Sequence, residues 1–116
     1  MTLTIKTIAA AAVGLAATTW GPAALAQPEG IHVVAGTYGA SCGVRWGNVT
    51  QDLAATCDGR WRCEYRVDVN RIGDPAPGCR KDYVARWRCP SGRIRTTSAP
   101  PEAGYGAVVR LSCGRD

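Results

Sequence analysis

Histidine and closely spaced cysteines are scarce in this sequence. It contains one histidine, His32, and its nearest cysteines, Cys57 and Cys63, are separated by five residues. Structural zinc sites draw their cysteines from close pairs such as C-x-x-C, so this spacing speaks against zinc. A single histidine also leaves no serine–histidine–acid set for nucleophilic catalysis. We therefore expect a protein that holds no metal and no other cofactor and that is not an enzyme.

Charged side chains are nearly missing from the first 28 residues, where Lys6 stands alone. An apolar, alanine-rich run over 7–20 follows it, and Ala24-Leu25-Ala26 supplies an A-x-A cleavage site. This order is typical of a secretory signal peptide, and the run is short for a membrane span. An uncleaved anchor is the alternative. We expect residues 1–26 to be removed, which leaves 27–116 as one secreted or periplasmic domain without an integral membrane segment.

All six cysteines lie in the expected exported domain. An even count in a small exported chain predicts three disulfides. A chain of this length buries a modest core, so covalent cross-links are usually needed to stabilise it. Six cysteines allow fifteen pairings, and composition alone does not choose among them. The cysteines are Cys42, Cys57, Cys63, Cys79, Cys89 and Cys113.

Arginine supplies almost all of the positive charge. Without Lys6, the chain has 13 Lys and Arg residues against 9 Asp and Glu, and only one of the 13 is lysine. This excess permits an anionic partner. Arginine and tryptophan alternate in Arg45-Trp46, Arg60-Trp61-Arg62 and Arg86-Trp87-Arg88, a pattern that can bind nucleic acid or acidic glycans. We favour the alternative that the tryptophans pack inside, and we expect no nucleic-acid partner.

Apolar periodicity predicts four strands and one helix. The strands are expected over 31–35, 63–69, 83–89 and 107–113, and the helix over 48–57 with Asn48 as its N-cap. The segments 70–78 and 90–106 are expected to be loops. Strands outnumber helices and no βαβ order is present. The sequence therefore predicts a small α+β domain, cross-linked by disulfides, with a mainly antiparallel sheet and one or two short helices.

Five short motifs occur in a characteristic order over residues 30–113. They are Tyr38-Gly39, Cys57-x-Gly59-x-x-x-Cys63, Ile72-Gly73-Asp74-Pro75, Lys81-x-Tyr83 and Trp87-x-Cys89. Together they make this segment resemble a SUEL-type lectin domain, a family also called the rhamnose-binding or galactose-binding lectin domain. The resemblance implies a lectin-like fold in which Tyr38, Asp74 and Lys81 converge on one exposed pocket around a sugar ring.

The resemblance also implies a disulfide pairing. The family commonly has eight cysteines, and the two that this chain lacks are bonded to each other there. The implied pairs are Cys42–Cys113, Cys57–Cys89 and Cys63–Cys79. The chain departs from the family in three ways: Ala40 replaces an arginine after Tyr38-Gly39, Cys79 is displaced along the loop, and the sugar-binding glutamate of the family's first strand has no counterpart.

These observations predict non-catalytic binding of a rhamnose- or galactose-type sugar by a monomeric exported protein. Two alternatives stay open. One is an envelope interaction or inhibitor protein without sugar affinity. The other is a small secreted ribonuclease, with His32 and Glu64 as acid and base.

Overall fold

The computed structural model describes residues 29–114, so the signal peptide expected over 1–26 lies outside the described residues. The described part contains five strands and two α-helices. The strands are β1 (His32–Tyr38), β2 (Arg62–Asp68), β3 (Tyr83–Arg88), β4 (Ile94–Ala99) and β5 (Tyr105–Ser112). The helices are α1 (Thr50–Cys57) and α2 (Val69–Ile72). Over these residues, no helix has the length and apolar character to cross a membrane.

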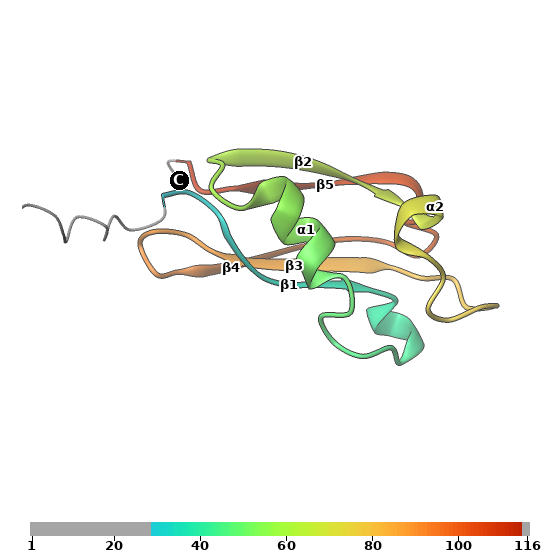
Figure 1. Cartoon of the computed structure of the whole chain (residues 1–116). Coiled ribbons are helices and arrows are strands. Elements are labelled where there is room, and N and C mark those ends of the chain that lie inside the picture. The colour runs from blue at the N-terminus through green and yellow to red at the C-terminus, as the bar shows by residue number, and fades with distance from the viewer. Residues whose placement is uncertain (1–28, 115–116) are drawn as a thin grey trace, which may run out of the picture.

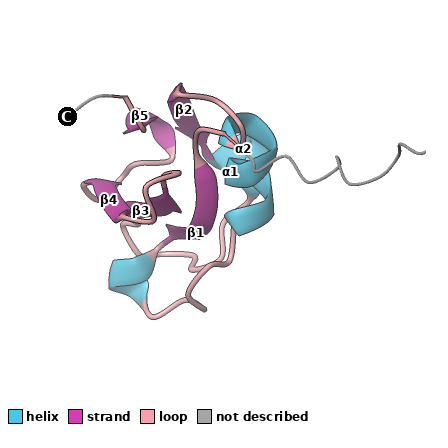
Figure 2. Cartoon of the chain, turned by 90° about the vertical axis from the view of Figure 1, so that its left-hand side faces the viewer, coloured by secondary structure: helices cyan, strands magenta, loops and turns pink. Residues whose placement is uncertain are grey.

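The strands form two antiparallel sheets that face each other. One sheet has the order β1-β3-β4, and the other consists of β2 and β5 (Figure 1). Seen along the strands, α1 covers the side where β1 and β2 face each other, and β4 and β5 come together on the opposite side (Figure 2). The expected small α+β domain with antiparallel pairing and three disulfides is therefore confirmed.

The inner faces of both sheets follow from strand alternation. In β2, Cys63, Tyr65 and Val67 are buried, while the side chains between them are exposed. Val109 and Leu111 of β5 lie opposite this strand and are buried as well. A sheet that is apolar on one face has to cover that face, and the second sheet does so here.

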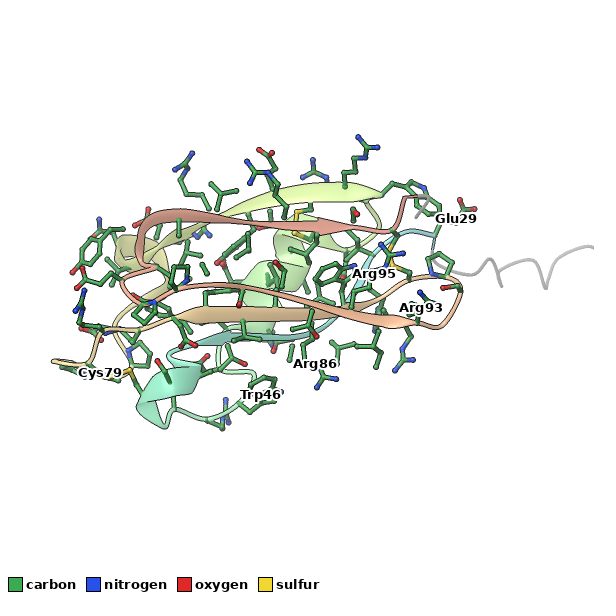
Figure 3. The ribbon with its side chains drawn as sticks, turned by 180° about the vertical axis from the view of Figure 1, so that it is seen from behind. Glu29, Trp46, Cys79, Arg86, Arg93 and Arg95 are labelled. Atoms are coloured by element: carbon green, nitrogen blue, oxygen red, sulfur yellow. A yellow bond between two sulfur atoms is a disulfide. The ribbon has the colours of Figure 1, made fainter. Side chains whose placement is uncertain are left out.

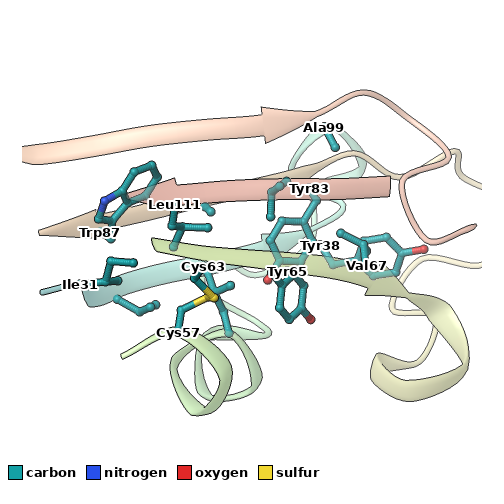
Figure 4. Packing of buried hydrophobic residues seen from close by; sticks show 14 of the residues in the cluster. Ile31, Tyr38, Cys57, Cys63, Tyr65, Val67, Tyr83, Trp87, Ala99 and Leu111 are labelled. Carbon is teal, nitrogen blue, oxygen red and sulfur yellow. A yellow bond between two sulfur atoms is a disulfide. The ribbon is translucent and has the colours of Figure 1, made fainter. Parts of the chain in front are cut away.

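Three tyrosines occupy the middle of the core (Figure 4). The ring of Tyr83 lies 6.4 Å from that of Tyr38 and 5.3 Å from that of Tyr65, measured between centroids. All three side chains are at most 2% exposed. Since the sequence contains no phenylalanine, these rings supply much of the buried aromatic area.

The free edge of β1 is covered by the segment that leads into α1. Asn48 accepts a hydrogen bond from the Tyr38 backbone N–H at 2.9 Å and donates to the Tyr38 carbonyl at 3.0 Å. The Thr50 hydroxyl accepts from the Gly36 N–H at 3.1 Å. Asn48 was expected to cap the helix, but Val49 occupies the N-cap position and the helix begins at Thr50. The Asn48 side chain satisfies a strand edge instead, which removes a site for unwanted pairing.

Two elements lie in segments that were expected to be loops. The strand β4 lies within 90–106. The short helix α2 begins at Val69 and extends over the first three residues of the segment 70–78. The sequence of β4 is Ile94-Arg95-Thr96-Thr97-Ser98-Ala99, in which apolar and polar residues do not alternate. Only Ala99 of this strand is fully buried. Pairing with β3 makes it a strand, and local sequence does not show that pairing.

The three disulfides differ from the pairing that the lectin resemblance implied. The bonds are Cys42–Cys79, Cys57–Cys63 and Cys89–Cys113. The expected bonds Cys42–Cys113, Cys57–Cys89 and Cys63–Cys79 are therefore wrong. The inner-face positions expected for Cys63, Cys89 and Cys113 are confirmed, but their partners are set by how the strand ends and loops come together.

The Cys57–Cys63 bond has a local origin. Cys57 is the last residue of α1 and Cys63 is the second residue of β2, so the turn between them brings the two Cα atoms to 5.4 Å. Such a separation suits a disulfide. The lectin family places these two cysteines in different bonds, so the observed bond removes the strongest support for the alignment.

Peptide mapping without reduction is expected to recover these three bonds from the oxidised protein. Digestion should yield a fragment pair joined through Cys42 and Cys79 and a second pair joined through Cys89 and Cys113. The Cys57–Cys63 bond should join neighbouring segments around Asp58-Gly59. A peptide that links Cys42 to Cys113 would contradict the structure and restore the pairing implied by the resemblance.

Candidate functional site

Lys81 and Asp74 form an ion pair beside the loop that follows α2. The Lys81 ammonium lies 2.8 Å from Asp74 Oδ1 and donates to the carbonyls of Cys79 at 2.8 Å and Ala76 at 3.2 Å. An ammonium has three donors, so all three are engaged by protein oxygens. Lys81 is also 92% covered at its side chain and lies 5.6 Å from the centroid of the Tyr38 ring. Lys81 therefore fixes the conformation of the loop between Asp74 and Cys79.

Tyr38 also reaches this pocket, but from the core side of it. Its side chain is 2% exposed and packs against the core, although its edge lines the pocket beside Lys81 and Asp74. The expected convergence of the three residues is therefore present in the structure. The expected exposure of Tyr38 is wrong, because the tyrosine ends β1 on the inner face of its sheet, opposite the buried Tyr83.

Three further side chains complete the pocket, and sequence reasoning missed all of them. Arg80, Glu102 and Tyr105 line a hollow of about 250 Å³ together with Asp74 and Lys81. Arg80 Nε lies 3.2 Å from Glu102 Oε2, and both side chains are at least half exposed. Tyr105 is 79% exposed. In the sequence Tyr105 stands between Gly104 and Gly106, and nothing local indicates that its ring is exposed beside this pocket.

The backbone of Glu102 adopts a left-handed conformation. Its φ is 74°, and it is the one non-glycine residue with positive φ in the described part of the chain. Such a conformation costs about 1–2 kcal/mol for a side chain of this kind, and it often occurs where function fixes a side chain. Here it follows Pro100-Pro101, and the Glu102 carboxylate pairs with Arg80.

Asp74 and Lys81 hold each other in their ionised forms. The hydrogen bond from Lys81 lowers the pKa of Asp74 below its ordinary value, and the same bond raises the pKa of Lys81. Burial raises the pKa of the Tyr38 hydroxyl. At neutral pH the pocket therefore presents an ionised carboxylate. Asp74 Oδ1 accepts from Lys81 and from the Ala76 N–H, so Oδ2 is the oxygen left for a ligand.

A second, larger hollow of about 600 Å³ lies at the start of α1. Its charged groups are largely occupied by one another. Arg71 lies 3.1 Å from Asp52 Oδ2, and the Tyr65 hydroxyl donates to the same oxygen. The Arg71 guanidinium also lies 5.2 Å from the centroid of the Tyr65 ring. This arrangement stabilises the packing of α1 against β2. None of the described residues that line this hollow is aromatic, whereas Tyr105 lines the pocket at Asp74.

Tyr65 gives the protein a specific response to alkaline pH. Burial, followed by the hydrogen bond to Asp52, raises its pKa from 10.0 to about 12. A raised tyrosine pKa means that its stabilising contribution is present below pH 10 and is lost as the pH rises to about 12. Between these values, Tyr65→Phe should lose less stability than the wild type, by roughly 3 kcal/mol. Urea unfolding of the wild type and the variant at pH 10 and at pH 12 measures the free energy of unfolding of each. An equal loss of stability in the two proteins between these pH values would contradict the prediction.

The ribonuclease alternative required His32 and Glu64 to meet. His32 lies opposite Arg88 in β1-β3-β4, whereas Glu64 lies opposite Arg110 in the other sheet, with Arg110 Nε at 3.0 Å from Glu64 Oε2. Both side chains are exposed, on strands whose inner faces form the core. Two sheets therefore separate the acid and the base that this alternative needs.

The arginine–tryptophan segments divide into two kinds. Trp87 is 4% exposed and its indole N–H donates to the Ser112 carbonyl at 2.9 Å, as expected for a core residue. Trp46 and Trp61 are 52% and 48% exposed, so the expectation of inward packing is wrong for these two. Both lie in turns outside the strands, where alternation does not direct a side chain inward.

Comparisons with protein-family models, with curated proteins and with solved structures found no match to this chain. All six cysteines are used in disulfides, and residues 29–114 contain no group of three or more potential metal ligands.

Proposed function

We propose that this domain binds a carbohydrate, without catalysis, in the pocket between Asp74 and Tyr105. The observation that carries the proposal is the lining of that pocket: two carboxylates, one guanidinium and one exposed tyrosine ring around about 250 Å³. Such a volume suits a single sugar ring or the end of a glycan rather than a large ligand. A rhamnose- or galactose-type sugar is the ligand class that we propose.

The polar groups are of the kind that vicinal hydroxyls need. The carboxylates of Asp74 and Glu102 accept hydrogen bonds from hydroxyls, and Arg80 donates to them. Hydrogen bonds with a charged partner are stronger than those between neutral groups. The ion pair between Arg80 and Glu102 lies at the surface, so it costs little to open toward a ligand.

Tyr105 supplies the apolar wall. A sugar ring presents a face of C–H groups, and a flat aromatic ring with a polar tip can cover that face while its hydroxyl stays in water. Tyr105 begins β5 and its side chain is 79% exposed. A large exposed aromatic side chain beside charged groups suits ligand contact better than packing.

The floor of the pocket is held by an ion pair, hydrogen bonds and a disulfide. Lys81 ties the loop through Asp74, Ala76 and Cys79, and Cys79 is itself bonded to Cys42. Tyr38 packs beneath them in the core. A preformed site loses less entropy when it binds a ligand. We therefore assign Lys81 and Tyr38 a positioning role, and we assign sugar contact to Asp74, Glu102, Arg80 and Tyr105.

A glycan array followed by NMR titration of the oxidised protein tests the proposal. We expect binding of a terminal sugar in roughly the millimolar range, as a single shallow pocket allows. Glu102→Gln should weaken binding about tenfold or more, because a charged acceptor becomes neutral. Tyr105→Ala should weaken it by a similar factor, since the ring wall is lost.

Glu64→Gln is the matched control. Glu64, like Glu102, is an exposed carboxylate in an ion pair with one arginine, at 3.0 Å and 3.2 Å respectively. It lies outside the pocket, so its substitution should leave sugar binding unchanged. Absence of binding across the array would overturn the proposal. Capture of an envelope protein that depends on Tyr105 would then favour the interaction-protein alternative.

A further inference from the structure

The outer face of the β1-β3-β4 sheet carries positive charge without negative charge. The three strands read HVVAGTY, YVARWR and IRTTSA and contain no aspartate or glutamate. The outer residues of β3, Arg86 and Arg88, have the alternate spacing that places two side chains on one face. His32 lies directly opposite Arg88 in the neighbouring strand. By contrast, Glu64 and Asp68 accompany the arginines of β2 in the other sheet.

The arginines on this face are not neutralised by the protein. Within residues 29–114, the structure shows no carboxylate in an ion pair with Arg86 or Arg88, whereas Arg71, Arg80 and Arg110 each have one elsewhere. Arg88 donates from one guanidinium nitrogen to the Gly92 carbonyl at 3.1 Å. That bond orients the guanidinium and leaves its other donors for a partner.

Apolar side chains lie among these charges. Val34 and Ile94 are each 39% exposed, and Ile94 lies directly opposite Arg88. Trp46 is 52% exposed and in Figure 3 lies on the same side of the sheet as Arg86. Its turn is fixed on the sheet by the Gly47 N–H, which donates to the Thr37 hydroxyl at 2.9 Å.

We call the set His32, Val34, Trp46, Arg86, Arg88 and Ile94 the basic face, and we propose that it binds an acidic polysaccharide. Guanidinium groups form paired hydrogen bonds with carboxylates and sulfates, which a lysine does not. Arg86 and Arg88 are about 7 Å apart along an extended strand, so successive anionic groups of a polymer can reach both. Trp46, Val34 and Ile94 cover the apolar faces of sugar rings between the anionic groups.

A polysaccharide fits this surface better than a nucleic acid. Proteins that bind single strands stack successive bases on several aromatic rings. Trp46 is the one exposed aromatic side chain that we assign to the basic face. The three disulfides also suit an oxidising environment outside the cytoplasm, where acidic glycans are accessible partners. The basic face shares no residue with the pocket at Asp74, so the two proposals stand separately.

Binding of the full oxidised protein to polygalacturonate, neutral dextran and oligothymidylate tests this inference. We expect binding to polygalacturonate that weakens with added salt and no binding to dextran. The double variant Arg86→Gln/Arg88→Gln should lower the affinity about tenfold or more. Trp46→Ala should lower it several-fold and leaves the net charge unchanged, so it separates ring contact from charge.

Arg62→Gln/Arg66→Gln is the matched control on the other sheet. It removes the same charge, and Arg66 donates to the Gly106 carbonyl at 2.9 Å much as Arg88 donates to Gly92. It should change the affinity less than twofold. An equal loss in both double variants would overturn the assignment of the basic face. Tighter binding to oligothymidylate, equal binding to dextran, or no binding to polygalacturonate would each overturn the choice of partner.

Discussion

Complete reduction of the three disulfides is expected to unfold this domain. The bonds span 37, 6 and 24 residues. In the loop-entropy account these spans correspond to about 3.8, 2.2 and 3.4 kcal/mol. Small domains are stable by roughly 5–15 kcal/mol in total, so losing all three bonds removes most or all of that margin. Circular dichroism with and without a phosphine reductant measures the loss of structure.

Two controls separate this effect from others. A chelator alone should leave the melting temperature unchanged, because every cysteine sulfur is bonded to another sulfur. Replacing both members of one pair by alanine should cost most for Cys42–Cys79 and least for Cys57–Cys63, in the order of the loop lengths. A fold that survives full reduction would contradict the prediction and place the stability in the core alone.

Gly104→Ala should destabilise the domain strongly, by about 3 kcal/mol or more. A Cβ atom at this position would lie 2.0 Å from the Tyr38 hydroxyl oxygen, 3.0 Å from its Cζ and 3.1 Å from Val69 Cβ. Tyr38 is 2% exposed and cannot swing away into solvent. Overpacking of a closed core typically costs 1–3 kcal/mol, and a contact this close lies at the upper end. Thermal unfolding of the purified variant measures the loss.

A second substitution tests the cause. Tyr38→Phe removes the hydroxyl that a Cβ at residue 104 would meet, so Gly104→Ala/Tyr38→Phe should be more stable than Gly104→Ala alone. Gly114→Ala is the control, since its nearest neighbour atoms lie 4.0 Å from the added Cβ and the space is open. Additive losses in the double variant would show that the hydroxyl is not the obstacle.

Strong alternation made several elements predictable. The strands β2 and β3 were predicted to within one residue at each end, because each has a run of buried side chains at every second position. The start of β5 was placed two residues late, since Tyr105 and Gly106 do not continue the buried pattern. The strand β4 was missed because its outer residues are polar and only Ala99 is fully buried. A strand of this kind depends on its neighbour for hydrogen bonds, and that neighbour is not visible in local sequence.

The candidate site was predictable only in part. The lectin resemblance implies that Asp74 and Lys81 meet, and their side chains do lie 2.8 Å apart. Their separation in sequence is short and the loop between them is closed by Cys79, so a meeting was physically plausible. Glu102 and Tyr105 come from a distant segment that reaches the pocket because Ala103 donates its N–H to the Lys81 carbonyl at 3.0 Å. No local signal announces such a contact.

By itself, the sequence determined that this protein has three disulfides, antiparallel strands with one apolar face each, and a short helix, because cysteine number and side-chain periodicity are local properties. The tertiary structure alone decided which cysteines join, that Lys81 holds a loop in place, and that Glu102 and Tyr105 reach the pocket at Asp74. These outcomes depend on which strand ends and loops come together in space. Cys57 bonds to Cys63 because a tight turn brings them to 5.4 Å, and Tyr38 is buried because β1 directs it inward.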